Sequence, residues 1–293
     1  MMTQHREILR RASEKLGGMT ASSTLPSALA SWADLSGWLR GGAPALFLDY
    51  DGTLTPIVQR PEDALLSDAA RAAVRAVAAV CPVTIVSGRD RTVVEELVGV
   101  DGLGYIGSHG FDIGGPAGSA LRHEVGGEHL PALDAAERLL RDRLAAVPGT
   151  SVERKRFGVA VHYRQALDRR SEVEAAVRAV EAEQSGLRLA AGKTVFELRP
   201  AIDWNKGRAI RWVLDHWPGA HGLPIHIGDD LTDETAFDAL AGDGLGVVVA
   251  KDDRPTAAQF VLRDPDEVRV FLERLARALR PSDAAGSGAW RRF

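Results

Sequence analysis

Two acidic motifs carry most of the chemical information in this sequence. Asp49 and Asp51 follow the apolar run "ALFL", and Asp229 and Asp230 follow the run "LPIHIG". Burying a carboxylate is costly unless its charge is paired, hydrogen-bonded or bound to a metal. If the two motifs meet in space, their oxygens suit one hard cation, for which Mg²⁺ is the natural candidate. The rest of the second motif, "LTDE", can equally be interpreted as helix-capping residues.

Two further residues have types and positions suited to binding a phosphate group. Lys206 precedes the helical pattern "GRAIRWVLDHW", where an ammonium group opposes the helix dipole. It is therefore a candidate phosphate-binding charge that also screens a carboxylate, with a solvated surface lysine as the alternative. Ser87 offers a hydroxyl at a predicted strand end, and its neighbour Gly88 allows a ligand to approach closely. Taken alone, Ser87 reads as a turn serine.

Short apolar runs alternate with helical patterns over much of the chain. Runs of strand length lie at residues 45–50, 82–86, 103–107, 223–228 and 245–250, and helical patterns at 67–80, 91–100, 207–217 and 266–279. This alternation predicts a parallel sheet covered by helices on both faces. The carboxyl ends of parallel strands meet at one edge of the sheet. We therefore expect Asp49, Asp51 and Ser87 to lie together at that edge.

The middle of the chain has a different pattern. "GKTVFELRP" alternates strictly, with Thr194, Phe196 and Leu198 on one face and Lys193, Glu197 and other residues on the opposite face. Such alternation suits an antiparallel sheet with one buried and one exposed face. The predicted fold class is α/β, a Rossmann-like parallel-sheet core with an inserted smaller α/β domain. The predicted boundaries are 1–40 for a helical extension, 41–118 and 201–281 for the core, 119–200 for the insertion and 282–293 for a loose tail.

Composition narrows the class of protein. The 293 residues include 36 basic and 40 acidic side chains, and this net charge of −4 argues against nucleic-acid binding. The single cysteine, Cys81, rules out a disulfide framework. No run approaches the roughly 20 apolar residues of a membrane span, and the first residues lack the apolar region of a signal peptide. We therefore expect a cytoplasmic protein without membrane association.

Together, the motifs resemble those of the haloacid dehalogenase superfamily of phosphotransferases. The order along the chain is Asp-x-Asp-Gly-Thr, then Ser87, then Lys206, then Gly-Asp-Asp. A narrower resemblance is to the trehalose-6-phosphate phosphatase family. The motifs that carry it are "LDYDGTLTPI", "SGR" at 87–89, "SHG" at 108–110, "HYR" at 162–164, "ELRP" at 197–200 and "GDDLTDE" at 228–234. That family has a small α/β cap between its Ser and Lys motifs, where this sequence predicts an insertion.

The resemblance implies a covalent mechanism. Asp49 would attack phosphorus, and Asp51 would protonate the leaving sugar oxygen and then activate water. Mg²⁺ would be held by Asp49, by the backbone carbonyl of Asp51 and by Asp229. Ser87 and Lys206 would bind phosphate oxygens. Thr53 would assist them, and Asp230 and Asp233 would order metal-bound waters or Lys206.

The resemblance also assigns recognition of the sugar to the cap. It carries over to Glu153, Lys155, Arg164, Lys193 and Glu197. From the core, Arg89 and His109 are expected to join them. Charged groups suit sugar hydroxyls because hydrogen bonds to charged groups are the stronger ones. The alternative is a solvated sheet face with salt bridges.

The activity implied by the resemblance is hydrolysis of trehalose 6-phosphate to trehalose and phosphate. This is the final step of trehalose biosynthesis, and it suggests a functional link to trehalose-6-phosphate synthase. Three alternatives stay open. The first is a related sugar phosphatase acting on sucrose 6-phosphate or a mannosyl phosphate. The others are a phosphotransfer mutase and a non-catalytic trehalose-phosphate sensor or synthase partner.

Overall fold

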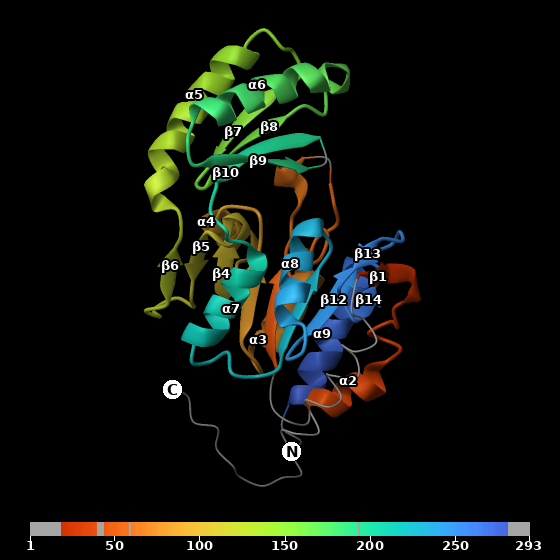
Figure 1. Cartoon of the computed structure of the whole chain (residues 1–293). Helices are drawn as coiled ribbons and strands as arrows, with labels where there is room; N and C mark the ends of the chain where they lie inside the picture. Colours follow the sequence, from red (N-terminus) through yellow and green to blue (C-terminus); the bar gives the residue numbers. More distant parts are fainter. Residues whose placement is uncertain (1–18, 40–43, 59, 193, 281–293) are drawn as a thin grey trace.

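The described residues form three sheets, of eight, four and two strands. The eight-stranded sheet, called the larger sheet below, forms the centre of the fold, and the four-stranded one is called the smaller sheet (Figure 1). The computed structural model describes residues 19–39, 44–58, 60–192 and 194–280. The larger sheet has eight strands in the order β14-β12-β11-β2-β3-β4-β5-β6, parallel from β14 to β4 and antiparallel at β5 and β6. The strands are β2 (Ala45–Asp49), β3 (Val83–Val86), β4 (Gly104–Gly107), β5 (Asp112–Gly114), β6 (Arg122–Glu124), β11 (Pro224–Gly228), β12 (Leu245–Val249) and β14 (Phe260–Leu262).

Helices cover both faces of this sheet, as the alternating pattern predicts. They are α2 (Trp32–Trp38), α3 (Asp68–Ala78), α4 (Arg91–Val98), α7 (Lys206–His216), α8 (Leu231–Leu240) and α9 (Pro265–Leu279). Leu46 and Leu48 of β2 belong to the buried cluster with α3, α4 and α9, whereas Ala45 and Phe47 belong to the cluster with α7 and α8. Both sets of side chains are therefore buried, which is why β2 is apolar at every position before Asp49.

The smaller sheet is antiparallel, with strand order β7-β8-β10-β9. Its elements are β7 (Ser151–Lys155), β8 (Gly158–His162), β9 (Leu187–Gly192), β10 (Val195–Pro200), α5 (Leu130–Leu144) and α6 (Arg170–Glu183). One face packs against α5 and α6 in its own buried cluster, to which Phe196 and Leu198 belong as predicted. In Figure 1 the two helices lie on the side of this sheet away from the larger sheet.

Two details differ from the sequence-based expectations. β6 pairs with β5 in the larger sheet, so the chain leaves that sheet after Glu124, later than the predicted boundary at residue 119. The polar face of β10 is not freely exposed, because Glu197 is only 6% exposed. Its contacts include His109, which belongs to the larger sheet's rim. Alternation correctly separates the two faces but does not reveal that the polar one is covered.

A short strand near the start of the described residues belongs to the third, two-stranded sheet. β1 (Thr20–Ala21) pairs with β13 (Pro255–Thr256). Single 3₁₀ turns lie at Ser22–Thr24, Pro61–Asp63, Ser108–Gly110, Gly127–His129 and Leu167–Arg169. The helical extension expected over residues 1–40 includes α2, whereas residues 1–18 and the tail expected at 282–293 lie outside the described residues. Among the described residues, no helix is both long enough and apolar enough to cross a membrane.

Candidate active site

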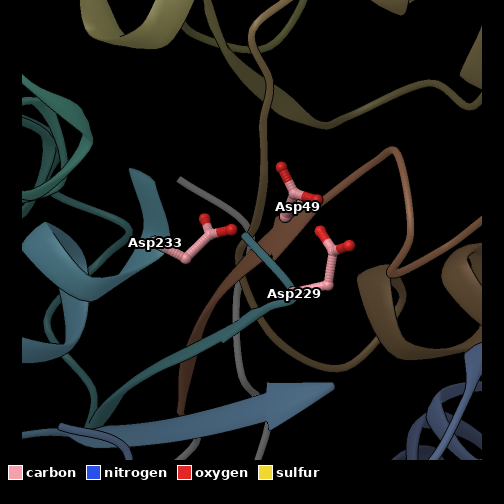
Figure 2. Close-up of side chains that lie close together, drawn as sticks. All are labelled: Asp49, Asp229 and Asp233. Atoms are coloured by element: carbon pink, nitrogen blue, oxygen red, sulfur yellow. The ribbon is translucent and has the colours of Figure 1, made fainter. Parts of the chain in front are cut away.

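Three carboxylates converge at the carboxyl edge of the larger sheet. Asp49 ends β2, Asp229 follows β11, and Asp233 lies in the first turn of α8. One ligand oxygen from each lies within 4.8 Å of those of the other two. Figure 2 shows the three side chains gathered around a common space, each from a different element. The two acidic motifs therefore meet, as their positions after parallel strands predict.

Lys206 lies between two of these carboxylates. As the first residue of α7, it donates from Nζ to Asp49 Oδ1 at 2.8 Å and to Asp233 Oδ1 at 2.7 Å. The lysine is buried, so it is not the solvated surface residue that was the alternative interpretation. Burial alone would lower the pKa of Lys206, but the negative charges of Asp233 and Asp49 outweigh burial and raise it. Lys206 therefore remains an ammonium ion.

The three carboxylates differ in how many hydrogen bonds their oxygens already accept. Asp233 accepts through Oδ1 from Lys206 and from His226 Nε2 at 2.9 Å, and through Oδ2 from the Asp230 amide at 3.0 Å. The Asp229 carboxylate accepts no hydrogen bond from any residue that the structure describes. Asp233 therefore orders Lys206, whereas Asp229 and the second oxygen of Asp49 are open to a further partner.

The pKa shifts show that this space favours a positive charge. Burial raises the pKa of Asp49 well above its usual value, and Asp233 and Asp229 add to the rise while Lys206 opposes it. Burial also raises the pKa of Asp229 to about 7, with the charges of Asp233 and Asp230 adding to the rise. A hard divalent cation would offset this crowding of carboxylates, and carboxylate oxygens are the ligands it prefers. The donor set thus fits a divalent metal.

The turn after β2 is shaped by close contact with Asp229. Gly52 has φ of +86°, and a Cβ there would lie 2.0 Å from Asp229 Oδ2. Only glycine satisfies both the left-handed conformation and this contact. Thr53 is fully buried beside it, and its Oγ1 has no hydrogen-bond partner among the described residues. A buried hydroxyl of this kind is costly unless a ligand or water supplies a partner.

Asp51 and Ser87 both contact Arg89 in the loop after β3. Arg89 forms a bidentate ion pair with Asp51, from Nε to Oδ2 at 2.8 Å and from Nη2 to Oδ1 at 2.6 Å. Ser87 is buried, and its Oγ accepts from the Arg89 amide at 3.1 Å. Ser87 therefore lies at the expected edge, and Arg89 contacts Asp51 directly.

A charged cluster lies between the two sheets. Glu197 interacts with Lys155 at 3.3 Å, with Arg199, and with His109 Nε2 at 4.0 Å. Arg199 Nη2 also lies 2.7 Å from His109 Nε2. Burial alone would raise the pKa of Glu197, but Arg199 and Lys155 outweigh it and lower the pKa to about 2. Burial and Arg199 lower the pKa of His109 well below its usual value, so its ring is neutral.

The remaining cap candidates are not part of this cluster. Glu153 lies 2.8 Å from His162 Nε2, and Arg164 is exposed with its Nε 3.4 Å from Thr194 Oγ1. Lys193 lies outside the described residues. Asp230 is the N-cap of α8 and forms a capping box with Asp233, so the capping interpretation of this motif is also correct. The Asp233 side chain therefore both caps α8 and orders Lys206.

Sequence reasoning missed three residues near these sites. His226 is fully buried in β11, where its Nδ1 lies 3.1 Å from the Phe47 carbonyl oxygen and its Nε2 contacts Asp233. Arg199 lies on the same face of β10 as Glu197, whose carboxylate it contacts. Arg254 contacts the backbone of Asp229 and Asp230 from a distant loop. A histidine inside an otherwise apolar strand was a usable signal, whereas nothing local marks Arg254.

The protein has a parallel-sheet core with an inserted α/β cap, and aspartates and a lysine converge at the carboxyl edge of that sheet. These features define the haloacid dehalogenase class. Comparison with known proteins narrows this class. A family model for trehalose-phosphatase matches residues 47–266. The chain is 46% identical to the trehalose-phosphate phosphatase of Mycobacterium marinum over 264 residues, 88% of this chain and 67% of that protein. It is also 46% identical to that of Mycobacterium tuberculosis strain H37Rv over 265 residues, with the same coverage.

The solved structures agree. The C-terminal domain of Candida albicans trehalose-6-phosphate phosphatase superposes with a TM-score of 0.72 at 25% identity, covering 86% of this chain and 98% of that one. The chain therefore belongs to the trehalose-phosphatase family, which confirms the family and the fold class expected from its motifs.

Proposed function

We propose that this protein hydrolyses trehalose 6-phosphate to trehalose and phosphate, the reaction named for its relatives. The observation that carries the proposal is Lys206, buried between Asp49 and Asp233 and beside Asp229. A protein that only binds its ligand, without reacting with it, has no need of a buried carboxylate that faces an open space. The link to trehalose-6-phosphate synthase and a cytoplasmic location remain predictions.

The proposed chemistry begins with Asp49. Its carboxylate attacks phosphorus and forms an aspartyl-phosphate while the bond from phosphorus to the sugar oxygen breaks. Asp51 gives its proton to that sugar oxygen, then takes a proton from the water that cleaves the aspartyl-phosphate. Ser87 and Lys206 bind phosphate oxygens. Both Asp51 oxygens are occupied by Arg89, so proton transfer requires this ion pair to loosen when substrate binds.

We further propose that the metal is Mg²⁺, held by Asp49, the Asp51 carbonyl and Asp229. When bound, it would supply positive charge that neutralises and aligns the transferring phosphoryl group. Asp230 and Asp233 would order its waters or Lys206. The Thr53 hydroxyl, which has no partner among the described residues, would be available to a phosphate oxygen.

The cap is proposed to select the sugar. Residues 125–200 would form it, because β6 belongs to the larger sheet. The side chains facing the substrate would be those of Glu153, Lys155, Arg164, Lys193 and Glu197, and Arg89 and His109 would complete the surface from the core. Its opening and closing would take place at hinges near 115–125 and 199–203, as lids commonly admit substrate and exclude water. Scattering profiles with and without a non-hydrolysable phosphate mimic should differ, and identical profiles would count against closure.

The deciding experiment is phosphate release from trehalose 6-phosphate with and without Mg²⁺. Rapid, Mg²⁺-dependent release is expected, with lower kcat/KM on sucrose 6-phosphate and on a mannosyl phosphate. The proposal fails if trehalose 6-phosphate stays intact while a generic phosphate ester is turned over. Product analysis excludes a mutase if phosphate is released rather than moved within the sugar.

Asp49→Asn tests the nucleophile. The variant should fold, because the amide has nearly the same shape, but lose at least about 10³-fold in kcat because an amide does not form the acyl-phosphate. Activity close to that of the wild type would assign the attack to another group. If the wild type and Asp49→Asn are both completely inactive, the result would instead favour a non-catalytic trehalose-phosphate sensor.

A further inference from the structure

Arg254 contacts the backbone of the proposed metal-binding turn. Its guanidinium donates to the carbonyl oxygen of Asp229 and, at 3.3 Å, to that of Asp230. The same group also pairs with the Glu234 carboxylate. Arg254 lies 25 residues after Asp229, in the loop between β12 and β13. One side chain thus holds two consecutive carbonyls and the first turn of α8.

Glu234 fixes the loop from the opposite side. Its Oε2 accepts from the Ala257 amide at 2.8 Å and from Thr256 Oγ1 at 3.2 Å. Glu234 is only 7% exposed, and Thr256 is fully buried. A buried carboxylate with this many donors is strongly restrained, because hydrogen bonds to charged groups are the stronger ones. The loop and the start of α8 therefore form one rigid unit around Arg254.

The N-terminal segment completes this support. β1 pairs with β13, and the Ser22 amide donates to the Arg254 carbonyl at 2.8 Å. In return, Ser22 Oγ accepts from the Arg254 amide at 3.1 Å, and the Ser23 amide donates to Asp253 Oδ1 at 2.9 Å. Ser22 is 2% exposed. The backbone of Arg254 is therefore fixed by Thr20–Ser23 while its side chain fixes Asp229.

We propose that Arg254 is a positioning residue for the divalent metal site, and that the segment Thr20–Ser23 is part of the device that holds it. The proposal rests on the metal site of the proposed function. Arg254 sets the orientation of the Asp229–Asp230 peptides, and that orientation directs the Asp229 carboxylate toward Asp49. Groups that orient metal ligands commonly change metal affinity about 10- to 100-fold when removed.

The test measures Mg²⁺ binding directly. Isothermal titration of the purified full-length protein with MgCl₂ should give a Kd about 10-fold or more weaker for Arg254→Ala than for the wild type. Arg254→Lys keeps the charge but lacks the planar fork of donors with which the guanidinium reaches separate acceptors, so an intermediate Kd is expected. Ser22→Ala removes the acceptor for the Arg254 amide and the long contacts of the same hydroxyl with Asp252 and Asp253. It should weaken binding about twofold to fivefold by loosening the same unit.

The matched control is Arg263→Ala. Arg263 lies nine residues further on and pairs with Glu267, and its side chain is 76% exposed. Its removal should leave the Kd for Mg²⁺ unchanged. Phosphate release at saturating Mg²⁺ should recover in Arg254→Lys, because excess metal compensates for weaker binding.

The outcomes separate this proposal from the proposed function. If Arg254→Ala lowers the melting temperature but leaves the Kd for Mg²⁺ within twofold of the wild type, Arg254 is a structural residue only and the proposal is wrong. If that variant does not fold, Arg254→Lys decides by the same criterion. If the wild type itself neither binds Mg²⁺ nor releases phosphate from trehalose 6-phosphate, the proposed function fails instead.

Discussion

At the scale of single residues, the site depends on charge balance around Lys206. Replacing it by Met leaves Asp49 and Asp233 buried without their cation, and breaking a buried pair in this way costs about 3–5 kcal/mol. A bound divalent ion would take over part of the neutralisation. The loss of unfolding free energy in Lys206→Met should therefore be smaller in saturating Mg²⁺ than in EDTA.

Urea unfolding with and without Mg²⁺ measures this difference. Lys251→Met, at an exposed lysine, is the control and should change neither value by more than about 0.5 kcal/mol. An equal loss with and without Mg²⁺ would show that the ion does not neutralise the carboxylates that Lys206 contacts.

Glu197 provides a pH-dependent prediction. Its pKa is lowered from 4.5 to about 2, because Arg199 and Lys155 outweigh burial. A lowered pKa in the folded state contributes stability above the unfolded pKa, and this contribution is lost as pH falls through the folded pKa. The wild type should therefore exceed Glu197→Gln in unfolding free energy by about 3 kcal/mol near neutral pH.

That difference should shrink as pH falls from about 4.5 toward 2, as measured by urea unfolding at a series of pH values. Glu62→Gln serves as the control, because the Glu62 side chain is 67% exposed. A difference for Glu197→Gln that stays constant across this range would mean that the carboxylate is not held ionised by its neighbours.

At the scale of elements, the packing of α7 against α8 sets the position of Lys206. A Cβ on Gly207 would lie 2.0 Å from the Thr235 carbonyl oxygen, so the two helices approach at a point where only glycine fits. Gly207→Ala should force them apart and cost about 1–3 kcal/mol of unfolding free energy. Activity should fall as well, because Lys206 is the preceding residue.

Urea unfolding and phosphate release measure both effects. Arg208→Ala, at an exposed position of the same helix, adds no bulk against α8 and should keep its stability within about 1 kcal/mol. Wild-type stability in Gly207→Ala would show that α8 can move aside without penalty.

The elements also show what could be predicted from the sequence and what could not. Asp49 and Asp229 follow apolar strands, so a local pattern and the rule for parallel sheets suffice to bring them together. Arg254 has no such pattern, because its role depends on a loop that returns to Asp229 in three dimensions. Burial of Glu197 was likewise invisible, since strand alternation assigns a residue to a face but does not show what covers that face.

At the scale of the whole molecule, Asp90 joins the two sheets. Its carboxylate oxygens lie 3.0 and 2.9 Å from the Arg156 amide, in the turn between β7 and β8, and Oδ1 accepts from Ser108 Oγ at 2.8 Å. The next residue in that turn, Phe157, stacks on Phe111, which precedes β5 of the larger sheet, with the two ring centroids 5.8 Å apart. Lys155, the last residue of β7 before the turn, contacts Glu197. Asp90 therefore holds one edge of the cap against the core.

Asp90→Ala should consequently impair substrates that need the cap more than those that do not. Hydrogen bonds to charged groups contribute about 1.5–3 kcal/mol, so kcat/KM for trehalose 6-phosphate should fall about 10-fold or more. Hydrolysis of p-nitrophenyl phosphate, which has no sugar for the cap to bind, should change little.

Asp90→Asn keeps one acceptor oxygen and should recover part of the loss. Glu124→Ala removes another contact of this turn with the core, the exposed ion pair with the Arg156 side chain, and should therefore reduce kcat/KM for trehalose 6-phosphate less than Asp90→Ala does. An equal loss on both substrates in Asp90→Ala would place its effect on the core chemistry, and would mean that the contact with the Arg156 amide does not govern how the cap meets the sugar.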